Sequence, residues 1–501
     1  MSDEHIQDLS EVMKVRREKL AQIQTAGVNP FTYSYKRSNT ASHILADFDN
    51  FENKIVSLAG RIMAIRRMGK ASFAHIMDAT ARIQIYVRMD AIGDESYSLF
   101  KLLDIGDIIG VEGEVMKTRT GEITVVVKKL ELLTKNLRPL PIVKEKEQDG
   151  EITTYDAFVD TEARYRQRYI DLIVNRQVMD VFRTRSQIIS AMREYLDNRG
   201  YLEVETPVLQ PLYGGATARP FITYHNALDM TLYMRIADEL YLKRLIVGGY
   251  DGVYEISKDF RNEGIDRTHN PEFTMMEIYV AYEDYQFMMN LVEEMVNFIA
   301  QKVLGTSKIT YQGTEIDLTA PWPRLPLFEA IEKYTGVNLS RMNIDQLKAV
   351  AKELGVETED FWGVGKIIDE IFAEKVEPHL IQPVFICDYP VELSPLAKRH
   401  RKNAKLVERF EPYVAGREIG NAFSELNDPI DQRERFEGQM KLKEAGDDEA
   451  QMLDEDFLRA LEYGMPPTAG LGMGIDRLVM LLTDQASIRD VIFFPTMRPE
   501  K

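Results

Sequence analysis

The chain has 501 residues, of which 45% are hydrophobic and 28% are charged, and its formal net charge is −18. This length exceeds what one hydrophobic core usually serves, so we expect two or three domains. No apolar run approaches the roughly 20 residues of a membrane span, the first residues lack the basic and apolar parts of a signal peptide, and the single cysteine, Cys387, excludes internal disulfides and cysteine-cluster zinc sites. These features predict a cytoplasmic protein that makes no membrane contact.

The charge is spread unevenly, and the first part of the chain is the least acidic. Residues 1–144 carry a small excess of Lys and Arg, whereas the remainder is strongly acidic. A weakly basic N-terminal module can meet phosphates, although a neutral solvated domain explains the charge equally well. Residues 6–26 place apolar side chains at helical spacing, with Arg16, Arg17 and Lys19 expected to face outward. We therefore predict an N-terminal helical extension over residues 1–50.

Residues 55–135 change to short runs of alternating apolar and polar side chains punctuated by glycines. Regularly spaced short strands over about 80 residues are typical of a small closed barrel. We place this barrel at 51–140. A linker is predicted at 141–160, where two prolines precede a charge cluster and Asp149-Gly150.

The remainder, 161–501, is predicted to be one mixed α and β domain. A helical tract runs from about 162 to 199, stops at Gly200 and passes into an extended segment at 201–207. Apolar helices are expected at about 238–247 and 284–304, and strands near 253–257 and 273–281. Residues 336–380 have helical periodicity and form a helical insertion for which the sequence offers no function.

Two strand-like segments place candidate site residues at alternating positions. Glu277 and Tyr279 should share one face of a largely buried strand, and Asn421, Phe423 and Glu425 should share one face of another. Glu411 and Glu418 precede the second strand, and paired carboxylates near a triphosphate are hard oxygen ligands that Mg²⁺ accepts. Exposed strand acids or satisfied ion pairs would give the same pattern.

The segment from Phe260 to Thr274 is the most informative part of the sequence. An arginine beside a carboxylate, Arg261 and Glu263, can grip a phosphate and accept from an amine, while His269 and Phe273 can close over a phosphate tail and a purine. A second segment, Gly470 to Arg477, is glycine-rich and ends in an arginine at a predicted helix start, where backbone amides favour phosphate. Alone, either segment could be a solvated hairpin or a structural turn.

The order of these segments resembles the three signature motifs of class II aminoacyl-tRNA synthetases: Gly200 to Pro207, Phe260 to Phe273, and Gly470 to Arg477. Within that class, a barrel ahead of the catalytic domain marks the aspartate, asparagine and lysine group. The strings from Gly214 to Phe221, Arg235 to Lys243 and Gly416 to Asp428 are similar to bacterial-type lysyl-tRNA synthetases. The resemblance implies an α+β protein, with an OB-fold barrel followed by a catalytic domain built on an antiparallel sheet flanked by helices.

Lysine presents two ammonium groups and one carboxylate, so its pocket should hold at least two carboxylates and one cation. The resemblance implies that the α-amino group meets Gly215 and Glu239, the carboxylate meets Arg261 and Asn421, the ε-ammonium meets Glu277, Tyr279 and Glu425, and the stem meets Phe423. For ATP it implies Arg261, Glu263, His269, Asn270, Phe273, Glu411 and Arg477, with Arg261 and Arg477 as the catalytic groups and Mg²⁺ on Glu411 and Glu418.

The resemblance further implies a homodimer, with a motif proline at its interface, and a tRNA(Lys) substrate whose anticodon the barrel reads. Such folds stack and hydrogen-bond single-stranded bases. Phe73 is the stacking candidate, and Gln84 and Glu122 are candidates for bonding a central uridine. A phenylalanine on a small barrel is equally often a core residue, so this assignment rests on the resemblance alone.

Three other functions fit parts of the sequence. The nearest is an aspartate or asparagine tRNA ligase of the same subgroup, whose pocket would need a deep cation. Another is an enzyme that lysylates a protein without tRNA, but such paralogues lack the N-terminal barrel. A third is a single-strand binder with a catalytically dead second domain, which would need a broken activating residue, whereas Arg261, Glu263, Phe273 and Arg477 are all present.

Overall fold

The structure is a computed structural model that describes residues 10–141, 144–148, 151–155, 158–359, 362–444 and 451–500. Its contacts divide the chain into two compact units. One contains the residues up to 164 together with 169–175, and the other contains 165–168 and 176 onward. Within the described ranges, no helix is long and apolar enough to cross a membrane.

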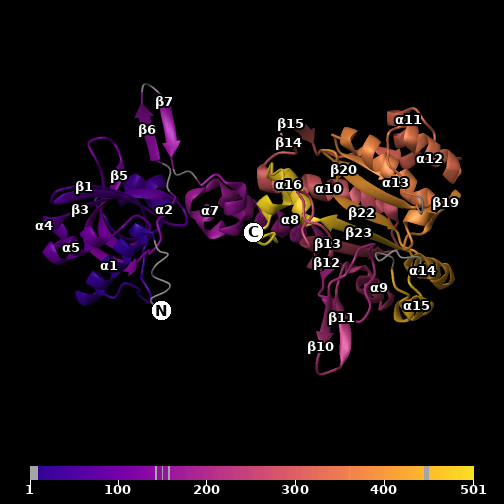
Figure 1. The fold of residues 1–501 in the computed structure, drawn as a ribbon, viewed down its shortest axis with the longest axis horizontal. Coiled ribbons are helices and arrows are strands. Elements are labelled where there is room, and N and C mark those ends of the chain that lie inside the picture. Colours follow the sequence, from indigo (N-terminus) through magenta and orange to yellow (C-terminus); the bar gives the residue numbers. More distant parts are fainter. Residues whose placement is uncertain are drawn as a thin grey trace. The chain divides into compact units, whose positions relative to one another are not determined.

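The first unit is built on a closed five-stranded barrel, as predicted (Figure 1). Burial alternates along its strands, so every second side chain, such as Ile62, Ile85 and Val125, fills the interior. The strands follow the order β1-β2-β3-β5-β4, and all neighbours are antiparallel except β3 and β5. The bounds are β1 Ile55–Met68, β2 Ala71–Met77, β3 Arg82–Arg88, β4 Ile108–Lys117 and β5 Ile123–Thr134.

Helices close this barrel and share its core, because Ile23 and Ile44 pack with the barrel residues. The expected orientation of the first helix is wrong in part. Arg16 is buried and donates to the backbone oxygens of Ile105 and Arg138, because a long side chain can bury its stem while its guanidinium reaches unpaired carbonyl groups. The bounds are α1 Glu11–Thr25, α2 Ala41–Ala46, α3 Phe48–Phe51, α4 Met89–Ile92 and α5 Asp94–Leu102.

The segment expected to be a linker includes a hairpin of β6 (Lys144–Gln148) and β7 (Glu151–Tyr155), while 142–143, 149–150 and 156–157 lie outside the described residues. The helical tract beyond it is not continuous as predicted. It forms α6 (Thr161–Arg166), α7 (Arg168–Val174) and α8 (Gln177–Asp197). The Asn175 amide donates to the Asp171 carboxylate at 2.7 Å and to the Phe158 carbonyl at 3.1 Å, and such local bonds compete with the helical ladder.

The second unit is built on a nine-stranded sheet whose central strands are antiparallel, and only the outer pairs β12–β8 and β16–β17 are parallel. The order is β16-β17-β20-β22-β23-β13-β12-β8, with β21 beside β20. The bounds are β8 Leu202–Glu203, β12 Gly252–Phe260, β13 Glu272–Ala281, β16 Arg324–Pro326, β17 Val384–Cys387, β20 Arg409–Val414, β21 Arg417–Glu418, β22 Gly420–Ser424 and β23 Thr468–Gly474.

The large core of this unit joins the sheet to α8, α10 (Tyr285–Leu304) and α16 (Ile475–Leu482). Their apolar faces contribute Met192, Val292 and Leu478, all fully buried. The sheet with helices against it confirms the predicted α+β architecture (Figure 1). The remaining helices are α9 Glu239–Val247, α11 Leu327–Thr335, α12 Ile344–Glu353, α13 Val364–Lys375, α14 Pro429–Glu444, α15 Glu455–Glu462 and α17 Ile488–Val491, with 3₁₀ turns at Glu377–His379 and Val391–Leu393.

Short strands outside the main sheet complete the unit. A three-stranded sheet joins β9 (Leu209–Gln210) to the β10–β11 hairpin (Ile222–His225 and Met230–Met234), which projects away from the main sheet in Figure 1. Two further pairs are β14 (Lys308–Tyr311) with β15 (Thr314–Asp317), and β18 (Arg399–His400) with β19 (Asn403–Val407).

Candidate active site

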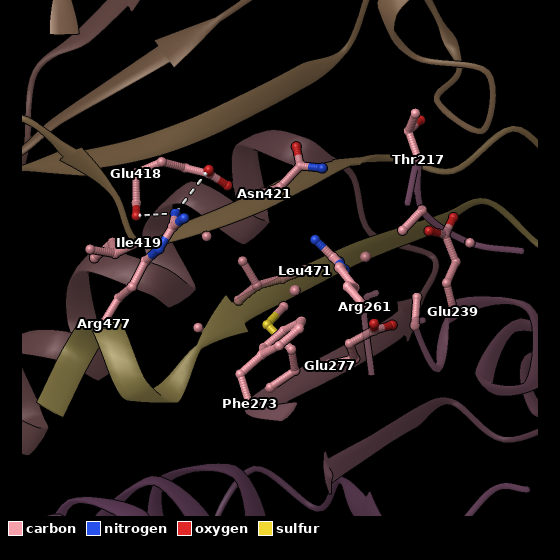
Figure 2. Close-up of a pocket in the computed structure, with 18 of the residues that line it drawn as sticks. Thr217, Glu239, Arg261, Phe273, Glu277, Glu418, Ile419, Asn421, Leu471 and Arg477 are labelled. Carbon is pink, nitrogen blue, oxygen red and sulfur yellow. Dashed lines mark hydrogen bonds and ion pairs between the residues drawn. The ribbon is translucent and has the colours of Figure 1, made fainter. Parts of the chain in front are cut away.

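The site lies where three sheet strands meet in register. Glu277 on β13 pairs with Gly472 on β23, which pairs with Asn421 on β22. Two residues further along β13, Tyr279 pairs with Gly470, which pairs with Phe423. The glycines of the middle strand leave open space between two rows of functional side chains. A cavity of about 330 Å³ forms over them (Figure 2).

Gly470 is the position where this space is most restricted. A Cβ atom there would lie 2.0 Å from Oε1 of Glu425 and 2.5 Å from the Tyr279 ring. Only glycine therefore allows Glu425 and Tyr279 to stand beside β23.

Arg261 occupies the middle of the cavity and follows the last residue of β12. Its guanidinium points between Asn421 and Glu277 in Figure 2, and its Nε donates to the Ile236 carbonyl at 3.3 Å. The same guanidinium lies 5.1 Å from the centre of the Phe273 ring on β13. The Nε atom of Arg261 is thus bonded to the protein backbone, while its guanidinium lines the cavity, where it can bind anions.

Two buried carboxylates face this arginine. Glu277 is 4% exposed; its Oε2 accepts from the Tyr279 hydroxyl at 3.0 Å and its Oε1 from the backbone amide of Asp238 at 3.1 Å. Glu239, at the start of α9, is also buried and lines the cavity beside Gly215. Burial raises the pKa of Glu277 well above its usual range, and neighbouring acids reinforce that shift. An incoming ammonium would relieve this cost.

Glu425, predicted to contact the amino acid, does not itself line the cavity but lies directly behind it. Glu425 is 1% exposed and forms an ion pair with Lys243 of α9, which also forms an ion pair with Glu239. Sequence reasoning did not assign Lys243. The signal was present, because Lys243 stands four residues after Glu239 on one helix, where side chains meet.

Arg409 on β20 is a second residue that the sequence did not reveal, and unlike Lys243 it lines the cavity. Its Nε donates to Asn421 Oδ1 at 2.9 Å, and its other nitrogens donate to Glu411 at 2.5 Å, to the Ser394 hydroxyl at 2.8 Å and to the Leu393 carbonyl. The Asn421 amide oxygen is therefore occupied, and its nitrogen remains to donate into the cavity. The spacing 409, 411 on one strand would have placed Arg409 beside Glu411.

Glu411 does not line the cavity, whereas Glu418 does. Glu411 accepts from the hydroxyls of Tyr389 and Tyr413 at 2.7 and 2.8 Å. The ring of Phe372, from α13 of the helical insertion, packs edge-on against Tyr413 with centroids 5.5 Å apart. The insertion thus supports the residues that hold Glu411.

Glu418 forms an ion pair with Arg477 of 3.1 Å, and its carbonyl accepts from the same nitrogen at 2.8 Å (Figure 2). Burial raises the pKa of Glu418, and Glu411 adds to that shift. Carboxylate oxygens are ligands that a divalent cation accepts, and of the two predicted magnesium ligands Glu418 is the one that faces the cavity.

Arg477 is fixed at the start of α16 by its neighbour Asp476, a further residue that sequence reasoning did not assign. Asp476 is buried, accepts from the Thr274 amide at 2.7 Å and pairs with Arg185 of α8 at 2.5 Å. Arg185 also donates to the Thr274 hydroxyl at 2.9 Å. These bonds lock the glycine-rich motif to the strand that carries Phe273.

The loop between β12 and β13 supplies three more predicted residues. Glu263 and His269 are exposed and line the cavity, and His269 Nδ1 lies 2.8 Å from Asp266. Asn270 is buried, and both ends of its amide already bond to the backbone: it donates to the Glu272 carbonyl and accepts from the Thr496 amide. The Asn270 side chain therefore anchors the loop.

A cluster of acids lies beneath Glu277. Oxygens of Asp238, Asp259 and Glu277 lie within 4.8 Å of one another. Arg235 provides the cation, 3.0 Å from Asp238, 2.7 Å from Glu255 and 3.5 Å from Asp259. Burial, with the charge of Asp259, raises the pKa of Asp238 to about 8. The cluster is an arginine-centred ion group with more acids than one arginine neutralises.

In the first unit, the three predicted base-reading residues lie together on the outer barrel face. Phe73 pairs across strands with Tyr86, and the two rings stack with centroids 4.4 Å apart. Gln84 donates to Glu122 at 2.6 Å and accepts from Thr124. His75, which sequence reasoning missed, lies 2.8 Å from Glu122. The face combines a two-ring platform with a hydrogen-bonded polar set.

Comparison with protein families agrees with this geometry. Residues 160–498 match the family of class II tRNA synthetases (D, K and N), and residues 56–133 match the OB-fold nucleic acid binding domain. The chain therefore belongs to the class II tRNA synthetases.

Individual relatives narrow the class. The chain is 57% identical to the lysine–tRNA ligase of Pelotomaculum thermopropionicum over 99% of this chain and 96% of that protein. It is 57% identical to that of Carboxydothermus hydrogenoformans over 98% and 99%, and 55% identical to that of Porphyromonas gingivalis over 99% and 87%. The chain belongs to the lysine–tRNA ligases, which confirms the resemblance and disfavours the aspartate and asparagine alternative.

Proposed function

We propose that this protein activates L-lysine with ATP, forming lysyl-adenylate and pyrophosphate, and then transfers lysine to the 3′ end of tRNA(Lys). One observation carries this proposal. A single cavity has the buried carboxylates Glu239 and Glu277 at one end. At its other end, Arg477 forms an ion pair with Glu418, a candidate magnesium ligand. Arg261 stands between the two ends (Figure 2). An amino acid with two ammonium groups fits the carboxylate end of such a site, and a polyphosphate fits the arginine end.

The lysine end follows from the charges. Glu239 and Gly215 receive the α-ammonium, while Glu277, Tyr279 and Glu425 receive the ε-ammonium. Phe423, which lines the cavity over Gly470, covers the aliphatic stem. The carboxylate lies between Arg261 and the Asn421 amide nitrogen, which Arg409 orients.

The ATP end uses the loop after β12 and the start of α16. Phe273 stacks on the purine and Glu263 accepts from its amine, while His269 and Arg477 meet the phosphate tail and Asn270 fixes the loop. Glu411 and Glu418 would hold Mg²⁺, which neutralises phosphate charge when bound.

The reaction needs no side-chain nucleophile. A lysine carboxylate oxygen attacks the α-phosphorus, the bond to the α,β-bridging oxygen breaks, and pyrophosphate leaves. Arg261 contacts both the attacking carboxylate and the α-phosphate, so it aligns the two and offsets the developing charge. A ribose hydroxyl of tRNA then attacks the lysyl carbonyl, and AMP leaves.

The barrel and the helices of residues 1–50 form the module that binds tRNA, with Phe73, Gln84 and Glu122 at the anticodon. Support comes from their shared outer face and from the match to nucleic-acid-binding OB-folds. The domain limits stay as proposed: 1–50, 51–140, a linker at 141–160, and 161–501 with the insertion.

The protein acts as a homodimer in the cytoplasm. Support for the dimer is a set of exposed apolar side chains around the first motif and the nearby hairpin: Leu202, Val208, Leu209, Ile222, Tyr224 and Leu228. Light scattering of the purified protein should give twice the 57.6 kDa of one chain. A monomer would contradict the dimer without affecting the proposed chemistry.

Exchange of radioactive pyrophosphate into ATP tests the activity directly. Each of the twenty amino acids is supplied separately with Mg²⁺ and ATP. We expect exchange with lysine alone. Exchange with aspartate or asparagine in its place would refute the substrate, and no exchange with any amino acid would favour a binding protein without activation chemistry.

A further inference from the structure

The buried lysine behind the cavity has no role in the reaction described so far. Lys243 is fully enclosed, and its ammonium forms ion pairs with Glu239 of its own helix and with Glu425, which follows β22. Three aromatic rings surround it, with its nitrogen 5.4 Å from the centre of Phe423, 5.9 Å from Tyr279 and 6.0 Å from Phe457. The Lys243 side chain has no exposed surface, and its ammonium is shared between these two carboxylates.

Lys243 offsets part of the electrostatic cost of burying these two carboxylates. Burial raises the pKa of Glu239 and raises the pKa of Glu425 well above its usual range, and the charge of Lys243 opposes both shifts. Although burial disfavours the ammonium as well, the two carboxylates raise the pKa of Lys243 above its ordinary value. Lys243 therefore remains protonated, and its charge favours the ionised form of the two carboxylates that a cationic substrate would meet.

Glu425 retains an unused oxygen. Its Oε1 is buried and has no hydrogen-bond partner among the residues that the structure describes, and it lies against the glycine floor, where a Cβ on Gly470 would approach to 2.0 Å. A buried acceptor without a donor is costly, so this oxygen is poised for a substrate donor. Glu239 lines the cavity itself, whereas Glu425 lies directly behind it.

Lys243 joins the two carboxylates assigned to opposite ends of the amino acid. We propose that Lys243 is a specificity-determining positioning residue: its single ammonium fixes the separation of Glu239 and Glu425, and so selects the length of the substrate side chain. This inference rests on the proposed lysine activation. A methylene in a hydrophobic pocket alone discriminates by only about 10–200-fold. Because Lys243 holds both Glu239 and Glu425 in place, a shorter diamino acid such as ornithine can reach only one of them. Its other ammonium group is then left without a carboxylate.

The test compares lysine with ornithine in pyrophosphate exchange. Lys243→Met keeps much of the volume and removes the tether. We expect kcat/KM for lysine to fall at least 30-fold, mainly through KM, while the lysine-to-ornithine preference falls at least fivefold and the KM for ATP stays within twofold. The matched control is Lys302→Met on an exposed face of α10, which should change none of these values.

Lys243→Arg decides the case if the methionine variant does not fold. It keeps the cation but spreads it over a wider planar group, so lysine use should partly recover while the lysine-to-ornithine preference still differs from the parent. An unchanged preference in whichever variant folds overturns the proposal, even if activity drops. Failure of the proposed function is separate, because the unaltered protein would then fail to exchange with lysine at all.

Discussion

Arg409 on β20 donates from its Nε to the Oδ1 of Asn421 on β22 at 2.9 Å, and this one bond fixes which end of the Asn421 amide faces the cavity. Since an asparagine can present either an acceptor or a donor, the neighbouring arginine determines that the site offers a donor. The same arginine pairs with Glu411, so it connects the amino-acid end of the site with the proposed magnesium end.

Arg409→Lys should therefore damage both ends. A lysine has no planar fork and cannot hold Asn421, Glu411 and Ser394 at once. A lost hydrogen bond to a charged group costs about 1.5–3 kcal/mol, so kcat/KM for lysine should fall roughly 10- to 150-fold. Pyrophosphate exchange measures this fall. Arg399→Lys, at a partly exposed ion pair with Asp431, should stay near the parent value; equal losses in both variants would contradict the assignment.

Glu277→Gln should impair lysine use by orders of magnitude. The carboxylate is buried, and a substrate ammonium left without it should cost roughly 3–5 kcal/mol. The measurement is KM and kcat for lysine, with the KM for ATP as the internal control. Near-normal lysine kinetics would remove Glu277 from the substrate contacts.

Gly470→Ala should abolish lysine activation while leaving a folded protein. The new methyl group would meet Oε1 of Glu425 at 2.0 Å and the Tyr279 ring at 2.5 Å, so these side chains must shift. We expect exchange activity below one hundredth of the parent. Gly438→Ala on α14 introduces a methyl group into open space and should be silent. Full activity of the Gly470 variant would mean that Glu425 and Tyr279 can move aside without loss of function.

Asp238→Asn should change how stability depends on pH. The pKa of Asp238 is raised to about 8 in the folded protein, against about 3.9 in an unfolded chain, so the folded state binds more protons between these values. This carboxyl therefore costs stability increasingly as pH rises from about 4 to 8, and the asparagine variant should gain in melting temperature relative to the parent across that window. The exposed Asp251→Asn variant should show no such trend. A pH-independent difference for Asp238→Asn would show that Arg235 keeps the carboxylate ionised.

Phe73→Ala should separate tRNA charging from lysine activation. Loss of a stacked base costs about 1–3 kcal/mol, so the KM for tRNA should rise roughly 5- to 150-fold while pyrophosphate exchange is unchanged. Tyr33→Ala provides a control, because Tyr33 is a fully exposed aromatic residue in the same unit. If exchange falls together with charging, the substitution has disturbed more than the anticodon face.

The sequence by itself determined the class of chemistry, the barrel and the shared faces of neighbouring strand residues. Alternation places Glu277 with Tyr279 and Asn421 with Phe423 because the strand period is two. The order of the motifs predicted the family that the relatives confirm. These features are local, so they can be read from adjacent residues.

Only the tertiary structure decided which partners complete the site. Arg409 lies 12 residues from Asn421, and Lys243 lies far along the chain from Glu425, so neither pairing has a local signal. Arg16 was expected in solvent but is drawn inward by carbonyl groups more than 80 residues away. Buried charges require partners wherever the fold supplies them, and the register of non-adjacent strands determines which residue that is.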